Sequence, residues 1–243
     1  MNTNPILNNT FSEKSIALQG EPMTVNGVMN KLGFLAILMA ISGGATWYQF
    51  AIGNIDKVNL LMYGGMIAGL ILVLITSFIR TAAPYTVPLY AFAEGAFLAG
   101  VSCFFEAMFP GIVVKAVSLT FITVFVMYIL YATRVINVTE KLKSTIITMT
   151  FAIMIFYLIT WILALFHINI PMLYGNSPLS VGFSLLVTGL AAFNLLLDFD
   201  FIERAAQNLF PKQYEWMGAF GLLVTIVWLY VEMLRLLSKL QRR

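Results

Sequence analysis

The sequence predicts an all-α integral membrane protein, a bundle of seven transmembrane helices. Two properties of the whole chain and one pattern along it predict this class. Of the 243 residues, 60% are hydrophobic and only 10% are charged, and the mean hydropathy is +0.89. The pattern is a series of seven long apolar segments. A soluble globular chain carries about 25% charged residues, so lipid must solvate most of this one.

Each apolar segment is close to the length that spans a bilayer, about 20 residues at about 1.5 Å of rise per residue. In chain order, the predicted spans are Leu32–Phe50, Val58–Ile79, Pro88–Met108, Ile112–Thr133, Thr145–Phe166, Leu179–Leu197 and Met217–Leu237. Polar segments, or segments rich in proline and glycine, separate them. Because a helix satisfies its own backbone hydrogen bonds inside lipid, each span is expected to be helical.

The chain is expected to have two parts, a polar N-terminal segment at residues 1–30 and a transmembrane domain at residues 31–243. The first part contains no early apolar run, so no cleavable signal peptide is expected. The first hydrophobic helix would then direct insertion.

Loop charges predict the orientation in the membrane. With seven spans, the N-terminal side holds eight basic residues: Lys14, Lys31, Arg80, Arg134, Lys141, Lys143, Arg204 and Lys212. The opposite side holds six: Lys57, Lys115, Arg235, Lys239, Arg242 and Arg243. Cytoplasmic loops carry the excess of Lys and Arg, so the N-terminus is predicted to be cytoplasmic.

The composition argues against several function classes. One cysteine, Cys103, excludes an internal disulfide, and one histidine, His167, is too few for a zinc site of several histidines. The basic residues are scattered and form no stripe for nucleic acid. No Gly-x-Ser-x-Gly string and no phosphate-binding glycine loop is present. We therefore expect neither an enzyme nor a resident cofactor; an aspartyl dyad of Asp198 and Glu232 is the remaining enzymatic alternative.

Acidic residues inside the apolar spans are the main candidates for function. Five lie within or at the edge of a span: Glu94, Glu106, Asp198, Asp200 and Glu232. An ionised carboxylate at the bilayer centre costs about 3 kcal/mol on insertion scales, so it normally faces the bundle interior, a partner or a water-filled cavity. Desolvation favours the protonated form of such a group. A carboxyl group that gains or loses a proton there can act as a gate.

The acids of the sixth and seventh spans have different expected surroundings. Asp198 and Asp200 project about 160° apart on a helix, so they cannot face the same cavity. Asp200 can pair with Arg204 one turn later. Glu232 either forms an ordinary ion pair with Arg235 near the end of the helix or is a functional residue.

Two further acids and two glycine pairs lie within or at the edge of the apolar spans. Glu94 is either a polar contact between helices or a pore residue, and Glu106 is expected at the interface. Small residues four or seven apart favour close helix contacts. Such pairs predict packing notches at Gly65 with Gly69 and at Gly182 with Gly189.

Four strings in this order carry a resemblance to a known family. They are Asn4-Pro-Ile-Leu7 with Met23-Thr-Val-Asn-Gly27, Tyr90-Ala-Phe-Ala-Glu-Gly95, Leu197-Asp-Phe-Asp-Phe-Ile-Glu203, and Glu215-Trp216 leading into Trp228-Leu-Tyr-Val-Glu232. The chain resembles the Bax-inhibitor-type (transmembrane Bax inhibitor motif) family over nearly its whole length. Within that family it is most similar to the bacterial YccA-like branch.

The resemblance implies a seven-helix bundle with a central last helix and a pH-sensitive calcium leak. In bacterial members, one acid of the sixth helix and one of the seventh share a proton in the closed state, and an Arg after the second helix competes for the sixth-helix acid. By motif these positions are Asp198, Glu232 and Arg80. The two acids would also coordinate calcium transiently. Secondary candidates are Glu94, Asp200 and Glu215.

The implied gate works through one shared proton. Two close carboxyl groups cannot both ionise cheaply, so the pair titrates as a unit. Loss of the proton would open a path for calcium, which prefers hard oxygen ligands. However, Asp198 lies about 28 Å down the sixth span, and Glu232 lies about 22 Å up the antiparallel seventh span from its start, so straight helices would leave the two carboxyl groups well apart in depth. In this sequence the seventh-helix acid is Glu, where the family has Asp.

A non-conducting regulator is the alternative function. The YccA-like relatives are associated with a membrane-bound AAA protease, and residues 2–20 could engage it as a polar arm. The expected partners are the lipid bilayer, calcium ions and protons, with that protease as a possible protein partner. The expected location is the bacterial inner membrane.

Overall fold

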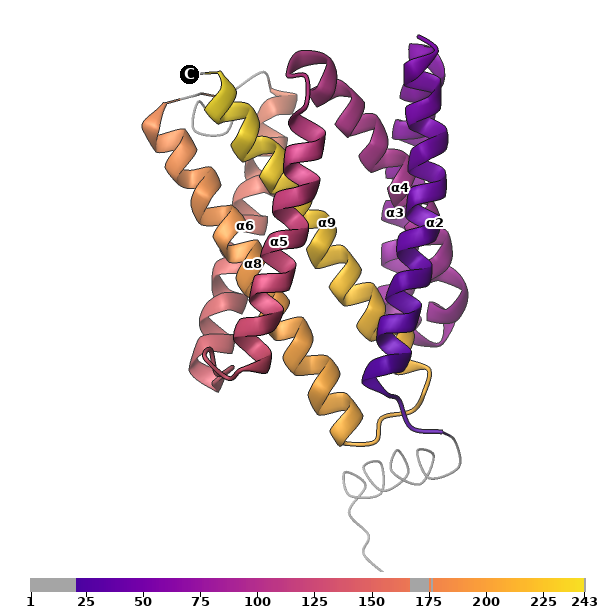
Figure 1. The fold of residues 1–243 in the computed structure, drawn as a ribbon, viewed down its shortest axis with the longest axis vertical. Helices are drawn as coiled ribbons and strands as arrows, with labels where there is room; N and C mark the ends of the chain where they lie inside the picture. Colours follow the sequence, from indigo (N-terminus) through magenta and orange to yellow (C-terminus); the bar gives the residue numbers. More distant parts are fainter. Residues whose placement is uncertain (1–20, 167–174, 176, 243) are drawn as a thin grey trace, which may run out of the picture. The chain divides into compact units, whose positions relative to one another are not determined.

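The computed structural model describes residues 21–166, 175 and 177–242. Figure 1 shows the long helices, numbered as there: α2 Val25–Ala51, α3 Ile55–Phe78, α4 Ala83–Met108, α5 Ile112–Ala132, α6 Glu140–Leu165, α8 Pro178–Gln207 and α9 Tyr214–Gln241. A 3₁₀ turn, η1 Arg80–Ala82, joins α3 to α4. Seven helices in this part of the chain are long and apolar enough to cross a membrane. The predicted all-α membrane fold is confirmed.

Some predictions fall outside the described residues. These are the string Asn4–Leu7, the polar arm at residues 2–20 and the lone histidine, His167. The remainder of the polar N-terminal segment is partly helical, because α2 begins at Val25, seven residues before the predicted span.

Side-chain caps explain where several helices begin. Thr24 accepts a hydrogen bond from the backbone N–H of Gly27 at the start of α2, and Asn54 and Thr139 cap α3 and α6 in the same way. Gly111 has a φ of 82°, a left-handed conformation that glycine adopts without strain, and it joins α4 to α5.

The sixth span is longer than predicted. Helix α8 continues to Gln207, ten residues past the predicted end at Leu197. The polar side chains that follow the apolar run form ion pairs and hydrogen bonds with one another along the same helix. Arg204 Nε lies 2.8 Å from Asp200 Oδ2, and Gln207 donates a 3.1 Å hydrogen bond to Glu203. Asp198 therefore lies inside a helix and not at its end.

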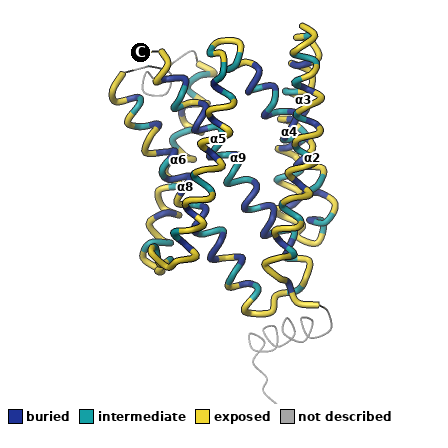
Figure 2. The backbone as a smooth tube through the Cα atoms, viewed as in Figure 1, coloured by how far each residue is buried: buried dark blue, intermediate teal, exposed yellow. Residues whose placement is uncertain are grey.

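Burial divides the helices into two groups. About half of the most apolar window is buried in α4, α8 and α9 (50–56%), compared with 11–22% in α2, α3, α5 and α6. Figure 2 shows the same difference along the tube, with buried positions concentrated on the first group. The polar positions most protected from the surroundings are therefore expected on α4, α8 and α9.

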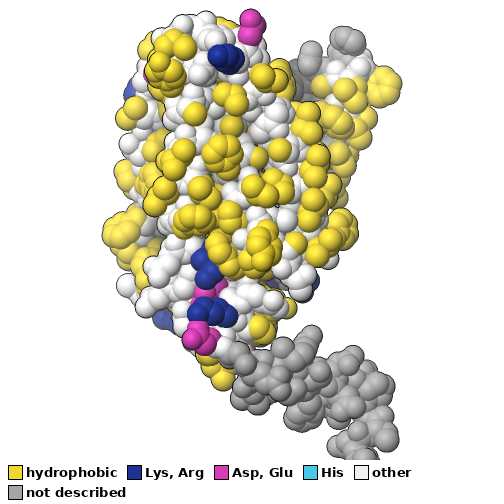
Figure 3. Space-filling model, turned by 90° about the vertical axis from the view of Figure 1, so that its right-hand side faces the viewer, with side chains coloured by type: hydrophobic (Ala, Val, Ile, Leu, Met, Phe, Trp, Pro, Cys, Tyr) yellow, Lys and Arg dark blue, Asp and Glu magenta, His cyan; other side chains and the backbone are white. Residues whose placement is uncertain are grey.

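The surface of the protein carries many exposed hydrophobic side chains. On the face in Figure 3, hydrophobic side chains cover the middle and charged side chains lie toward the two ends. Large hydrophobic side chains on α2 and α3 are more than half exposed: Ile37, Ile41, Leu60, Ile67 and Leu70. A surface of this kind is suited to a hydrocarbon solvent.

The chain divides into two compact units, Met1–Ala99 with Asp200–Leu223 (unit 1) and Gly100–Phe199 with Val224–Arg243 (unit 2). In unit 1, glycines allow helices to approach closely. A Cβ on Gly65 of α3 would overlap the carbonyl oxygen of Ala93 in α4, and a Cβ on Gly95 would overlap Met39 of α2. The predicted notch at Gly65 is confirmed.

In unit 2, aromatic side chains join the helices. The ring of Phe199 on α8 lies 5.6 Å from Tyr128 and 5.8 Å from Tyr131 on α5. The predicted notches at Gly182 and Gly189 are wrong, because a Cβ at either position would meet no atom within 4 Å. These two glycines instead line an apolar groove with side chains of α6.

Candidate functional site

Asp198 lies in α8 on the side that contacts α9. Its carboxyl group accepts a hydrogen bond from the Thr225 side chain of α9. The second oxygen, Oδ2, is buried and has no hydrogen-bond partner. A buried polar atom without a partner costs about 1–3 kcal/mol, so this group is held in an unfavourable environment that the fold tolerates.

A second contact fixes the register between α8 and α9. The buried Lys239 of α9 donates a 2.7 Å hydrogen bond to Ser184 of α8. Ser184 and Asp198 are 14 residues apart on α8, and Thr225 and Lys239 are 14 residues apart on α9. The two helices in unit 2 therefore run antiparallel in constant register over about 21 Å.

Glu232 lies seven residues after Thr225, on the same face of α9 and about 10.5 Å farther along it. Its side chain is only 1% exposed. Oε1 accepts hydrogen bonds from the Tyr157 hydroxyl (3.1 Å) and from Arg235 Nη1 (3.0 Å), whereas Oε2 is buried without a partner. The predicted pair with Arg235 is confirmed.

The two acids have separate partners in this structure. Asp198 is bonded by Thr225 and Glu232 by Tyr157 and Arg235, and the second oxygen of each carboxylate has no partner. The hydrogen bond between the carboxyl groups that the resemblance implies is therefore not formed. The difference in depth that the sequence predicted is the physical reason.

The remaining acids are explained by local contacts. Glu94 of α4 lies beside Gly69 of α3, where a Cβ would be 3.1 Å from its Oε2, and the Tyr90 side chain hydrogen-bonds it. Glu106 accepts hydrogen bonds from the backbone N–H groups of Gly111 (2.6 Å) and Val113 (3.1 Å) and so caps the start of α5. Glu94 therefore contributes to a contact between two helices, and Glu106 caps the start of one.

Arg80 and Asp200 both belong to unit 1. Arg80 begins the 3₁₀ turn after α3 and is exposed. Asp200 is buried and forms the predicted ion pair with Arg204 one turn later. Asp198 belongs to unit 2, so the competition of Arg80 for Asp198 stays a prediction.

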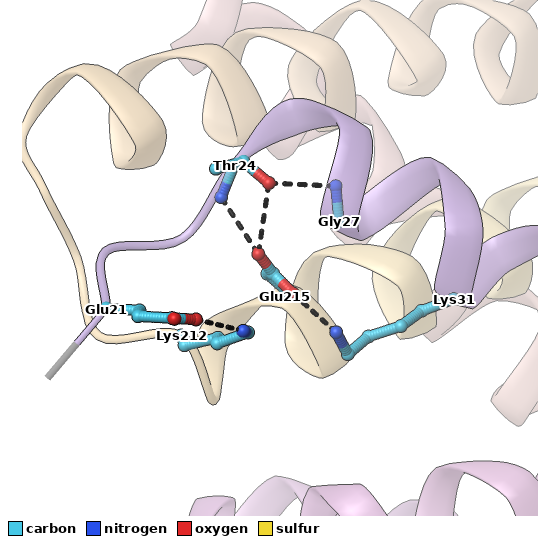
Figure 4. A network of polar contacts seen from close by, with 6 residues as sticks. All are labelled: Glu21, Thr24, Gly27, Lys31, Lys212 and Glu215. Carbon is cyan, nitrogen blue, oxygen red and sulfur yellow. Dashed lines mark hydrogen bonds and ion pairs between the residues drawn. The ribbon is translucent and has the colours of Figure 1, made fainter.

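Glu215, a secondary candidate, is the centre of a polar network in unit 1 (Figure 4). Its carboxylate accepts hydrogen bonds from the backbone N–H (2.9 Å) and the hydroxyl (3.2 Å) of Thr24 and pairs with Lys31. Beside it, Lys212 pairs with Glu21. Glu215 is 2% exposed, and both of its oxygens have partners.

The backbone reinforces this network. Pro22 and Pro211 form an isolated antiparallel bridge, flanked by hydrogen bonds from Met23 N to Phe210 O (2.8 Å) and from Lys212 N to Glu21 O (3.2 Å). The start of α2 is thus fixed to the connection between α8 and α9 within unit 1.

Sequence reasoning missed two partners of the acids, Thr225 and Tyr157, and the buried Lys239 that bonds Ser184. Each is a polar side chain inside or at the end of an apolar run. A search for polar residues at multiples of seven along the last helix would have connected Thr225, Glu232 and Lys239, because such positions share a face. Tyr157 lies on another helix and gives no comparable signal.

Comparison with known families agrees with this architecture. The model of the family described as Bax inhibitor 1 like matches residues 4–242. Neither the curated proteins nor the solved structures compared with this chain give a match. Assignment to the bacterial YccA-like branch stays a prediction. Because the family match runs over nearly the whole chain and the seven span-length helices agree with it, the protein belongs to the Bax inhibitor 1 like family and is a multi-pass membrane protein.

Proposed function

We propose that this protein is a pH-sensitive calcium leak, opened when Asp198 loses its proton. The observation that supports this most directly is the buried Oδ2 of Asp198, which has no hydrogen-bond partner although it lies against α9. On the same proposal, the protein lies in a bacterial inner membrane with its N-terminus in the cytoplasm.

The physical basis is the cost of charge inside lipid. With a proton, Asp198 is neutral and its burial beside Thr225 is tolerable. Without the proton, the carboxylate needs water or a cation, because an ionised group at this depth costs several kcal/mol. Opening α8 from α9 would admit both. Calcium suits the site because it prefers carboxylate and other oxygen ligands.

Glu232 would act as a second binding position for calcium and not as a proton-sharing partner. Arg235 and Tyr157 hydrogen-bond its Oε1, and its Oε2, which has no partner, remains available to a passing cation. Glu232 follows Thr225, the partner of Asp198, on the same face of α9 and about 10.5 Å farther along that helix. A calcium ion would therefore meet the two carboxylates in succession.

Arg80 is proposed to regulate the gate. As the resemblance implies, a cation at this position competes with protons for Asp198 and stabilises the deprotonated state. Replacing Arg80 by Gln should then move the rise of flux to higher pH, and an unaltered pH profile would exclude this role.

Calcium flux into proteoliposomes tests the proposal. In the wild type, flux should rise as pH is raised, because deprotonation opens the path. Asp198→Asn mimics the protonated acid, so its flux should stay at the level of protein-free liposomes at every pH. Glu232→Gln should lower flux while retaining its pH dependence.

Asp200→Asn is the matched control, because it changes the same residue type two positions away at a group already paired with Arg204. Its flux should follow the wild type. If Asp198→Asn conducts calcium with the wild-type pH profile, the gating proposal is wrong.

A second candidate function is regulation of a membrane-bound AAA protease through the N-terminal arm. The observation that favours it is the network around Glu215 and the bridge at Pro22, which fix the base of that arm. Deleting residues 2–20 should abolish co-purification with the protease and leave flux intact. Loss of flux on this deletion, with the protease still bound, would contradict the second candidate.

A further inference from the structure

A pocket of about 520 Å³ lies in unit 2, around the last turns of α4, α6 and α9 and the first turns of α8. Its size lies in the range of small-molecule sites, which is about 300–1,000 Å³. Because helix ends surround it, the pocket lies where a membrane span reaches the headgroup region. It is separate from the contact of Asp198 with Thr225.

The pocket has a strongly basic lining. Arg235, Lys239 and Arg242 all line it, and the described lining residues include no acid. Glu232, which is not in the lining, pairs with Arg235. The lining itself carries an excess of positive charge, so the pocket attracts an anion and disfavours a free cation.

The three cations are held in place by other groups. Lys239 donates hydrogen bonds to Ser184 Oγ (2.7 Å) and to the Ser180 carbonyl oxygen (3.3 Å). The Arg235 guanidinium lies 5.2 Å from the ring centroid of Tyr157, and that of Arg242 lies 5.6 Å from Phe109. Positioned cations of this kind suit an anion with several oxygen atoms, and Arg in particular suits phosphate.

Part of the remaining lining is aromatic and exposed. Phe104 and Trp161 line the pocket and are 64% and 62% exposed. Exposed aromatic side chains at the end of a span are typical of the level of lipid headgroups and upper acyl chains. The site therefore offers cations to an anionic group and an apolar surface to the chain attached to it.

We propose that this pocket binds the phosphate headgroup of an anionic phospholipid. Basic pockets between transmembrane helices are known to accept such headgroups. Arg235, Lys239 and Arg242 would contact the phosphate oxygens, and Phe104 and Trp161 would contact the glycerol and the first acyl carbons. The proposal is independent of calcium conduction, because it concerns binding only.

Native mass spectrometry of the purified full chain tests it, with phosphatidylglycerol and phosphatidylcholine offered separately. Phosphatidylglycerol should be retained in preference to phosphatidylcholine. Replacing both Lys239 and Arg242 by Ala should weaken phosphatidylglycerol binding about 25-fold, at about fivefold for each basic side chain. Equal retention of the two lipids by the wild type would overturn the proposal.

Two further variants keep the test decisive. Lys115→Ala removes an exposed cation from the start of α5, outside the pocket, and should bind as the wild type does. Arg242→Lys keeps the charge at an exposed position and should retain most of the binding, even if Lys239→Ala proves poorly folded. If Arg242→Ala alone binds as tightly as the wild type, the assignment is wrong.

A final arm separates lipid from soluble phosphate. Excess inorganic phosphate should leave the phosphatidylglycerol bound, because it lacks the apolar part that contacts Phe104 and Trp161. If inorganic phosphate displaces the lipid, the occupant is a soluble phosphate and the lipid assignment is overturned.

Discussion

Glu215 and Glu232 lie on the same helix, α9, the first in its opening turn and the second farther along, and they are almost equally buried, at 2% and 1% exposed. Their surroundings differ. Glu215 has a partner for each oxygen, from Thr24 and Lys31, whereas Glu232 has one oxygen with two donors and one with none. The comparison indicates that a fully satisfied buried acid holds helices together, and that a partly satisfied one is available for another ligand.

The largest expected effect is a difference in thermal stability between variants of the two acids. Glu215→Ala leaves Lys31 and the Thr24 N–H without their acceptor, and breaking a buried pair costs about 3–5 kcal/mol. Thermal unfolding in detergent should therefore show a clearly lower midpoint. Glu232→Gln keeps the shape and the acceptor for Tyr157, so it should lower the midpoint less. The opposite order of midpoints would contradict the comparison.

A smaller effect tests how tightly the Glu215 network is built. A Cβ on Gly27 would overlap the Glu215 carboxylate, so Gly27→Ala should destabilise the protein by about 1–3 kcal/mol, as overpacking does. Gly33→Ala is the matched control in the same helix, because a Cβ there meets no atom within 4 Å. It should stabilise the protein by about 0.5–1 kcal/mol. Equal midpoints for the two variants would show that the network adapts freely.

Asp200 sharpens the same comparison on α8. Its partner Arg204 is 49% exposed, so the pair is screened by solvent and Asp200→Asn should cost less than about 1 kcal/mol. Its unfolding midpoint should therefore fall by much less than that of Glu215→Ala. A loss as large as that of Glu215→Ala would show that partner number does not decide the role of a buried acid.

The smallest effect concerns the exposed pair beside Glu215. The hydrogen bond and the charge of Lys212 lower the pKa of Glu21 below its ordinary value. Because the folded-state pKa is depressed, the pair contributes stability above the unfolded pKa of Glu and loses it as pH falls through the folded one. Glu21→Gln should thus have a slightly lower midpoint than the wild type near neutral pH and the same midpoint in acid. Adding salt should also remove the difference, and a difference that persists in acid would contradict this account.

The fold was largely predictable, because hydropathy sets the number and length of spans. The prediction was weakest where a helix continues through polar residues. Helix α8 passes Asp198 and Asp200 to Gln207, since pairs such as Asp200 with Arg204 lie along the helix and replace external partners. Hydropathy treats such a pair as two separate charges, and so it ends the span too early.

The candidate site was only partly predictable. The sequence identified Asp198 and Glu232 as buried acids and Arg235 as a neighbour, because these facts depend on composition and local spacing. It did not identify Thr225 or Tyr157, since contacts between helices depend on how each helix is rotated and tilted. Hydropathy carries no information about rotation when a helix is apolar on all sides.

The hydroxyl of Thr24 accepts a hydrogen bond from Gly27 and donates one to Glu215, so one atom serves both the first turn of α2 and the first turn of α9. A mechanical load on the chain ahead of Glu21 reaches α2 along the backbone, and this hydroxyl, the bridge at Pro22 and the pair with Lys212 carry part of it to the connection between α8 and α9. Tension on the N-terminus would therefore be transmitted in part to the base of the last helix. Replacing Thr24 by Val would remove the hydroxyl from that linkage while keeping its shape, and the backbone bond of residue 24 to Glu215 would remain.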